Sequence, residues 1–173
     1  MQKGPNNTTG AIQGISFLPD GRDITLCSGE GCPIKRSCFR YLAEPAGRQD
    51  FFGMPPVLPD GTCPEYWDAI PTFTLALDRP AVERLATEIS RQDPAPANCA
   101  WELAEIYLRM KAPRYREGVA IQPPEQEIRE QAYFLWLANQ DDKQKWHWLL
   151  AEARLLSDVL NRLTTKRNDQ GTR

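Results

Sequence analysis

The sequence predicts a mainly α fold, in which a small cysteine-rich α+β metal-binding module precedes helices and a C-terminal helical hairpin. Apolar residues recur at helical spacing from residue 78 onward. Four of the five cysteines lie before residue 64, and 15 prolines in 173 residues favour several small units with irregular connections. The expected segments are a disordered tail at 1–10, the metal-binding module at 11–70, a helical middle segment at 71–112, a linker at 113–124, the helical hairpin at 125–164 and a disordered tail at 165–173.

The N-terminal module opens with turn chemistry. Residues 18–21 read Leu-Pro-Asp-Gly, in which proline presets φ and glycine accepts a positive φ. We expect a β-hairpin here, with residues 11–18 and 22–27 as its strands. The same tetrapeptide returns at 58–61, and each copy is soon followed by a cysteine.

A short helix is predicted over residues 33–45. Pro33 suits the first helical position, where its missing N–H has no partner to lose. Apolar side chains from Ile34 to Leu42, with Cys38 among them, recur at the spacing of one helix face. A proline and a glycine after this run are expected to end the helix.

The four N-terminal cysteines have the spacing C-x4-C-x5-C-x24-C. Four thiolates satisfy the tetrahedral coordination of zinc, and four can also hold an iron–sulfur cluster. We expect Cys27 at a strand end, Cys32 at the helix N-cap and Cys38 on that helix. The helix dipole at an N-cap lowers a thiol pKa, which favours the ligating thiolate. The predicted metal ligands are Cys27, Cys32, Cys38 and Cys63.

The cellular compartment determines whether these thiols are reduced or oxidised. The chain begins with polar residues and has no apolar stretch near the roughly 20 residues that span a bilayer. We therefore expect a cytoplasmic protein without a membrane partner, whose thiols are kept reduced. Two alternatives to a metal site stay open, namely reduced or redox-active thiols and, less favoured, structural disulfides. Among cofactors we favour zinc over an iron–sulfur cluster.

Residues 26–67 also carry a resemblance. The stretch from LCSGEGCP through KRSCFRY to GTCPEYW resembles small cysteine-rich proteins found in phage and bacterial genomes. Those proteins typically read C…CP…C-(Phe/Tyr)-R-Y…Q…C. The resemblance implies that the four cysteines form one unit.

Helices are expected in the middle segment. Asp78 is a suitable N-cap for a helix over 78–92, and a second helix is expected over 97–110. The sequence DPAPAN at residues 93–98 ends the first helix and separates it from the second. The linker at 113–124 has prolines at both ends, which prevent one helix from running through.

The C-terminal part predicts two helices, over 125–139 and 145–163. Five polar residues join them, which is short enough to favour antiparallel packing. We expect Trp136 and Trp148 to form the core of this hairpin. The apolar stripes predicted for the two helices are Ile128, Ala132, Leu135 and Trp136, and then Trp146, Leu149, Leu150, Ala153, Leu156, Leu160 and Leu163.

This part resembles a short bacterial helical domain of unknown function. The shared pattern is Ile-Arg-x-x-Ala-Tyr-x-x-Trp, a polar loop, and Trp-x-x-Ala-Glu-x-x-Leu. An ion pair across the hairpin, between Arg129 and Glu152, is plausible on this pattern. The matching residues are Ile128, Arg129, Ala132, Tyr133, Trp136, Trp148, Ala151, Glu152 and Leu155.

Charge gives a weak indication of nucleic-acid binding. The net charge of −2 gives no overall attraction to phosphate, so any basic surface is local. Residues 109–116 combine four basic side chains with a tyrosine, a composition that can grip single strands, although a solvated segment is the favoured reading. Further basic residues lie beside the cysteines, at Lys35, Arg36, Arg40 and Arg48.

Catalysis is not favoured. A nucleophilic pair of Cys99 with the single histidine, His147, is conceivable, but a buried structural cysteine is far commoner. The function we predict is a non-enzymatic, zinc-binding interaction or adaptor protein with a protein partner. The alternatives are an iron–sulfur redox or sensor protein, and a nucleic-acid-binding regulator that uses the basic residues near the metal.

Overall fold

The computed structural model describes residues 12–111, 114–116, 119–139 and 142–170, so the expected tail at 1–10 lies outside it. The mainly α prediction is confirmed, because helices dominate the part of the chain that is described. In chain order the elements are the 3-10 helix η1 (Lys35–Ser37), α1 (Phe39–Leu42), α2 (Ile70–Ala76), α3 (Arg79–Gln92), α4 (Pro96–Lys111), β1 (Arg114–Arg116), β2 (Val119–Ile121), α5 (Glu125–Ala138) and α6 (Lys143–Gln170).

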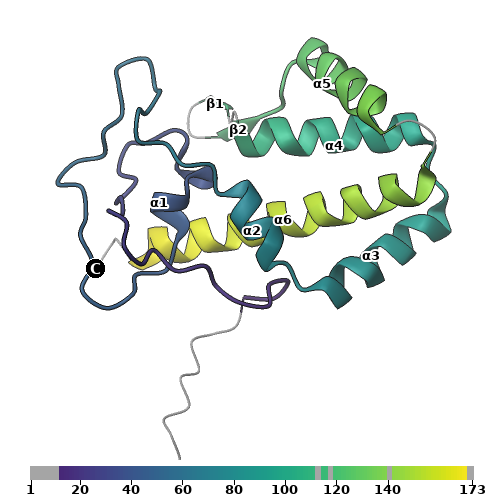
Figure 1. Cartoon of the computed structure of the whole chain (residues 1–173). Coiled ribbons are helices and arrows are strands. Elements are labelled where there is room, and N and C mark those ends of the chain that lie inside the picture. Colours follow the sequence, from purple (N-terminus) through teal and green to yellow (C-terminus); the bar gives the residue numbers. More distant parts are fainter. Residues whose placement is uncertain (1–11, 112–113, 117–118, 140–141, 171–173) are drawn as a thin grey trace, which may run out of the picture.

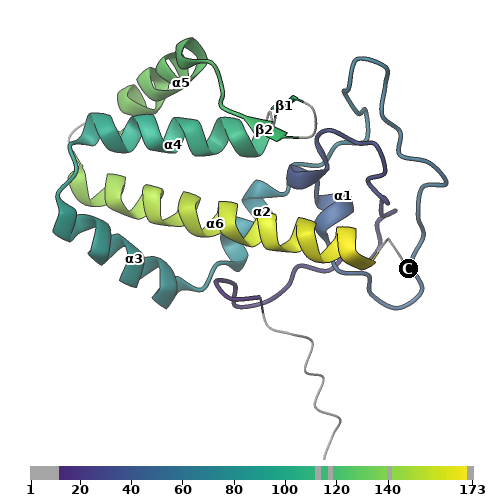
Figure 2. The same ribbon diagram turned by 180° about the vertical axis from the view of Figure 1, so that it is seen from behind.

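The last helix, α6, is the central element of the fold (Figure 1). It packs between α3 and α4, and its C-terminal half reaches α2, η1 and α1. Helix α5 packs on α4 instead, on the side away from α3 (Figure 2). The expected antiparallel hairpin of α5 with α6 is therefore wrong, because α3 and α4 already cover the apolar stripe of α6.

Trp146 is the tryptophan of the core. It is 1% exposed, whereas Trp136 is 41% exposed and Trp148 is half-buried. The expected core around Trp136 and Trp148 is therefore wrong, since Trp136 lies on the outer surface of α5 and the Trp148 ring faces the Arg79 guanidinium at 5.6 Å. The stripe predicted for α6 is confirmed by the buried residues Trp146, Leu150, Ala153, Leu156, Leu160 and Leu163.

The expected ion pair between Arg129 and Glu152 is also absent from the described residues. Arg129 pairs with Glu125 one turn earlier in α5, at 2.6 Å. Glu152 pairs with Arg79 of α3, at 2.8 Å. Both changes follow from α6 lying against α3 rather than against α5.

Helix α3 begins and ends as predicted. The Asp78 carboxylate accepts a 3.2 Å hydrogen bond from the Ala81 N–H, which satisfies one unpaired donor of the first turn. At the other end Asp93 adopts a left-handed conformation with φ of 43°. Helix α4 then begins at Pro96, within one residue of the predicted start.

The predicted linker contains regular structure. Strands β1 and β2 lie inside it and pair antiparallel, with Tyr115 opposite Ala120. The pairing satisfies backbone groups that an irregular linker would leave to water. Residues 113 and 117–118 of the predicted linker lie outside the described residues.

The predicted N-terminal β-hairpin is wrong as well. The backbone of residues 20–26 pairs with a later part of the chain, through isolated bridges of Asp20 with Glu44 and of Leu26 with Phe51. The Leu26 N–H donates to the Asp50 carbonyl at 2.8 Å. Because these groups are used there, residues 12–18 and 22–27 do not pair with each other.

The end of α6 departs from the expected tail at 165–173. Residues 165–170 continue the helix, and residues 171–173 are outside the described part. Arg167 explains why the helix continues, because it donates to the backbone carbonyl of Ala43 and lies 5.7 Å from the centre of the Tyr41 ring. Among the described residues, no helix combines the length and the apolar character that a membrane span requires.

Candidate metal centre

All four predicted metal ligands border one small cavity. Its wall includes Cys27, Cys32, Cys38 and Cys63. The free space at its centre is about 10 Å³, which is about the size of one water-sized sphere. Its remaining wall consists of Gly29, Ile34, Lys35, Arg40, Tyr41, Phe52, Pro56, Val57 and Glu65.

The loop from Cys27 to Cys32 is shaped by glycine. Gly29 has φ of 66° and Gly31 has φ of 64°, a region that side chains with a Cβ rarely adopt. At Gly29 a Cβ would also lie 2.5 Å from Cδ2 of Tyr41, so the backbone runs directly against that ring. This close approach fixes the loop between Cys27 and Cys32 against the Tyr41 ring.

Backbone amides point at the first two sulfur atoms in the same way. The Gly29 N–H donates to Sγ of Cys27 at 3.4 Å. The Ile34 N–H faces the thiol of Cys32 and offsets part of the rise that burial causes in its pKa. In both cases the donor lies two residues after the cysteine. Such amide hydrogen bonds stabilise thiolate, and thiolate is the form that ligates metals.

Cys38 lies at a break between two short helices. The predicted helix over 33–45 is split into η1 and α1, with Cys38 between them in an extended conformation with φ of −93° and ψ of 121°. The break has a tertiary cause, because Cys38 forms an antiparallel bridge with Asp68. Phe39 N–H donates to the Trp67 carbonyl at 2.7 Å, and Ala69 N–H donates to the Ser37 carbonyl at 2.8 Å.

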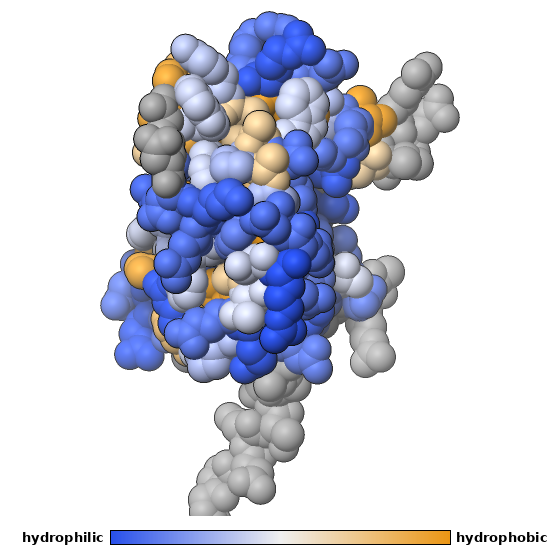
Figure 3. Space-filling model, turned by 90° about the vertical axis from the view of Figure 1, so that its right-hand side faces the viewer, coloured by the Kyte–Doolittle hydropathy of each residue, from blue (hydrophilic) through white to orange (hydrophobic). Residues whose placement is uncertain are grey.

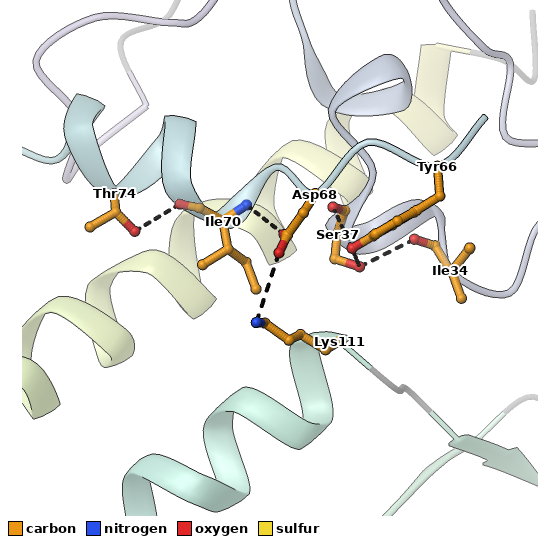
Figure 4. Close-up of polar contacts among 7 residues, drawn as sticks. All are labelled: Ile34, Ser37, Tyr66, Asp68, Ile70, Thr74 and Lys111. Atoms are coloured by element: carbon orange, nitrogen blue, oxygen red, sulfur yellow. Dashed lines mark hydrogen bonds and ion pairs between the residues drawn. The ribbon is translucent and has the colours of Figure 1, made fainter. Parts of the chain in front are cut away.

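Side chains reinforce this bridge (Figure 4). The Tyr66 hydroxyl lies 3.2 Å from the carbonyl of Ser37 and 3.1 Å from its hydroxyl. The Asp68 carboxylate accepts from the Ile70 N–H at 3.0 Å and lies 3.8 Å from the Lys111 ammonium. The segment that carries Cys38 is thereby tied to α2 and to the end of α4.

Cys63 follows the second Pro-Asp-Gly turn, as predicted. Gly61 N–H donates to the Leu58 carbonyl at 2.9 Å, and Leu58 N–H donates to the Thr62 carbonyl at 2.8 Å. Gly61 takes the positive φ, 83°. The turn reverses the chain, so that Cys63 returns to the cavity.

The thiols are close enough to influence one another. Burial raises the pKa of the Cys27 thiol, with smaller increases from Cys38 and Cys63. Burial likewise raises the pKa of Cys32, and the other three thiols of the cavity raise it further. The expected lowering of the Cys32 pKa at a helix N-cap is wrong, because the first helical turn begins only at Lys35.

The thiols do not form a ligand set in the present arrangement. Among the residues that the structure describes, no group of three or more His, Cys, Asp or Glu side chains is disposed to hold a metal ion. The four cysteines are also free of disulfides. They therefore share one cavity as separate thiols.

Two basic residues beside the cavity are engaged within the protein. Lys35 donates to Oδ1 of Asn168 at 3.3 Å and lies 5.3 Å from the centre of the Tyr41 ring. Arg40 pairs with Glu65 at 3.2 Å. These contacts direct both charges toward the protein rather than toward a phosphate in solvent.

Cys99 and His147 do not form a catalytic pair. Cys99 is 1% exposed on α4, and burial raises the pKa of its thiol, with Glu102 and Arg154 as the nearest charges. His147 borders a different cavity, between α3 and the start of α6, together with Lys143 and Asp93. Figure 3 shows this end of the molecule as mostly hydrophilic.

The comparisons give no relative. No protein family, no curated protein and no solved structure matches this chain. The residues of the cysteine cavity are therefore the evidence for its function.

Proposed function

We propose that Cys27, Cys32, Cys38 and Cys63 bind one structural zinc ion, and that the protein is a non-enzymatic interaction or adaptor protein. The observation that carries the proposal is that these four thiols, from three separate stretches of chain, border a single cavity. Four cysteines form a closed tetrahedral zinc site, with no open position for a substrate. Such a site supplies folding energy rather than catalysis.

The residues fit zinc by their donor chemistry, because four thiolates complete its tetrahedral coordination. The amides near Cys27 and Cys32 stabilise the thiolate form that zinc requires. Binding requires the four side chains to turn inward onto the ion, because in the present arrangement they surround the space without converging on it.

The cysteine-rich segment also has a need for the ion. Between residues 12 and 69 the described helices are only η1 and α1, of three and four residues. Its buried apolar side chains, such as Leu26 and Leu42, belong to the core shared with the helices, so the loop around the cysteines has little regular structure to hold it. Zinc bound by the folded segment but weakly by the unfolded one would add its binding free energy to folding.

The exposed surface of α5 supports the proposal that this protein binds another protein. Tyr133 and Phe134 are 57% and 64% exposed, and Trp136 and Leu137 lie beside them at the surface. Clustered exposed aromatics of this kind mark protein-binding surfaces more often than scattered ones do. The proposed partner is therefore a protein, contacted through the outer face of α5.

Elemental analysis of protein purified without oxygen tests the metal site. We expect one zinc per chain in the wild type, less after Cys38→Ser, and an unchanged amount after Cys99→Ala, the matched control at a buried cysteine outside the cavity. Colourless protein is expected, whereas brown protein containing iron and sulfide would replace zinc with a cluster. Wild-type protein without metal would reject the proposal.

A further inference from the structure

Arg40 connects the parts of the chain that carry Cys27, Cys38 and Cys63. It lies two residues after Cys38, and its backbone carbonyl accepts a 2.9 Å hydrogen bond from the Cys27 N–H. Its guanidinium reaches two further carbonyls, one near Cys27 and one near Cys63. We propose that Arg40 is a positioning residue of the zinc site, which brings the cysteine stretches together and offsets their charge. This inference rests on the proposed function.

The guanidinium contacts are specific. Its Nη1 donates to the Thr25 carbonyl at 2.9 Å, two residues before Cys27. Its Nε donates to the Glu65 carbonyl at 3.0 Å, two residues after Cys63. Its Nη2 pairs with the Glu65 carboxylate at 3.2 Å. One side chain thus fixes the spacing of segments that are far apart in the sequence.

The surroundings of Arg40 hold it in this orientation. Its side chain is 19% exposed. The guanidinium lies 5.5 Å from the centre of the Phe52 ring and 5.8 Å from that of Trp67. Cations at this distance from aromatic rings are attracted to the ring faces. The orientation therefore exists before any metal binds, so little freedom is lost on binding.

Charge gives Arg40 a second effect. Zinc with four thiolates carries a net charge of −2, and Arg40 borders the cavity that would hold it. A fixed positive charge at the edge of a partly buried site stabilises such an anion more than the same charge in water. Glu65 takes up part of that charge, so we assign the larger effect to the hydrogen bonds.

Lysine cannot reproduce this arrangement. An ammonium group is a single point, whereas the planar guanidinium donates in several fixed directions at once. Arg40→Lys keeps the charge but cannot donate hydrogen bonds to the carbonyls of Thr25 and Glu65 at the same time. Arg40→Gln removes the charge as well. The two variants therefore separate positioning from charge.

Zinc affinity and the cobalt(II) absorption spectrum of the full chain test the proposal. We expect both Arg40 variants to bind zinc about 10–100-fold more weakly than the wild type, the loss typical of groups that orient metal ligands. Their cobalt thiolate bands should also be weaker, since fewer thiolates reach the ion. Arg22→Gln is the control, because Arg22 pairs with Asp20 at the surface.

The outcomes are distinct. Folded Arg40 variants with the zinc affinity and cobalt spectrum of Arg22→Gln would overturn the role of Arg40 while leaving the zinc site intact. A wild type that binds neither ion would instead overturn the proposed function. If both variants fail to fold, hydrogen exchange of the wild-type protein tests the role of Arg40 instead. The Arg40 Nε–H should then exchange more slowly after zinc is added, and unchanged exchange would overturn the proposal.

Discussion

The Tyr41 hydroxyl forms a 3.1 Å hydrogen bond with the side-chain oxygen of Asn168, across 127 positions of the sequence. The Lys35 ammonium donates to the same oxygen at 3.3 Å. Lys35 and Arg167 also face the Tyr41 ring, at 5.3 Å and 5.7 Å from its centre. Because Tyr41 and Lys35 border the cysteine cavity, the end of α6 is docked on the wall of the proposed zinc site.

Removing the Tyr41 hydroxyl should loosen this docking. Tyr41→Phe keeps the ring between its two cations but loses the hydrogen bond to Asn168, at an expected cost of about 1 kcal/mol. Hydrogen exchange should rise in the last two turns of α6 and stay unchanged in its first half. Tyr133→Phe, at an exposed position of α5, is the control and should leave exchange as in the wild type.

Metal removal should have a graded effect along the chain. Without zinc we expect residues 27–63 to lose protection from hydrogen exchange, because the ion supplies their folding energy. The end of α6 should lose protection with them through its contact with Tyr41. We expect α3, α4 and the first half of α6 to stay protected, because these helices pack on one another away from the cysteine cavity. Simultaneous loss everywhere would show a single cooperative unit.

Gly29 and Gly31 form a matched pair of substitutions. Both have nearly the same positive φ, but a Cβ at Gly29 would collide with Tyr41, whereas at Gly31 it would meet open space. Gly31→Ala should cost about 1 kcal/mol for the left-handed backbone alone. Gly29→Ala should cost about 1–3 kcal/mol more, the range seen for overpacking. Equal losses in denaturant unfolding would rule out the contact with Tyr41 as the cause.

The tryptophans should differ strongly in their effect on stability. Trp146→Ala removes a fully buried ring and should cost about 3–5 kcal/mol in urea unfolding. Trp136→Ala should cost far less, because that ring is 41% exposed. Trp146→Phe should be milder than alanine, since the indole Nε1 has no hydrogen-bond partner among the described residues. A large loss at Trp136 would contradict this assignment of the core.

Alkaline pH should weaken the fold through Cys99. Burial raises its thiol pKa in the folded protein above the ordinary 9.0. Below 9.0 both folded and unfolded states keep the proton, so its contribution to stability is complete. Above that value the unfolded state loses the proton first, and stability falls until the folded pKa is passed. Cys99→Ala should therefore lose less stability than the wild type between about pH 8 and about pH 10.

Local signals in the sequence predicted most of the helices. The carboxylate of Asp78 and the apolar stripe of α6 each depend on neighbours within one or two turns, so helix α3 and the buried face of α6 could be found without tertiary information. An amphipathic stripe shows that a helix packs but not against which partner. For that reason the sequence does not reveal that α5 packs on α4. It also does not reveal that Trp146, rather than Trp136, is the buried tryptophan of the core.

The sequence predicts which four cysteines lie together, but not the backbone structure that brings them together. The spacing of the four cysteines, with the turn before Cys63, indicated one group. The break at Cys38 depends on the bridge to Asp68, 30 positions later, which no local pattern reveals. The sequence indicates Arg40 only as a nearby charge, because its hydrogen bonds to Thr25 and Glu65 exist only after the chain has folded.

The central position of α6 sets the order in which the chain can fold as it leaves the ribosome. The helix that fills the space between α3 and α4, and that docks on Tyr41, is synthesised after the elements it packs against. At translation speeds of about 5–20 residues per second, the cysteine loop emerges roughly 5–20 s before the end of α6. During that interval the four thiols lack their helical support. Early zinc capture would then add a contact that orders the loop and shields its thiols from oxidation.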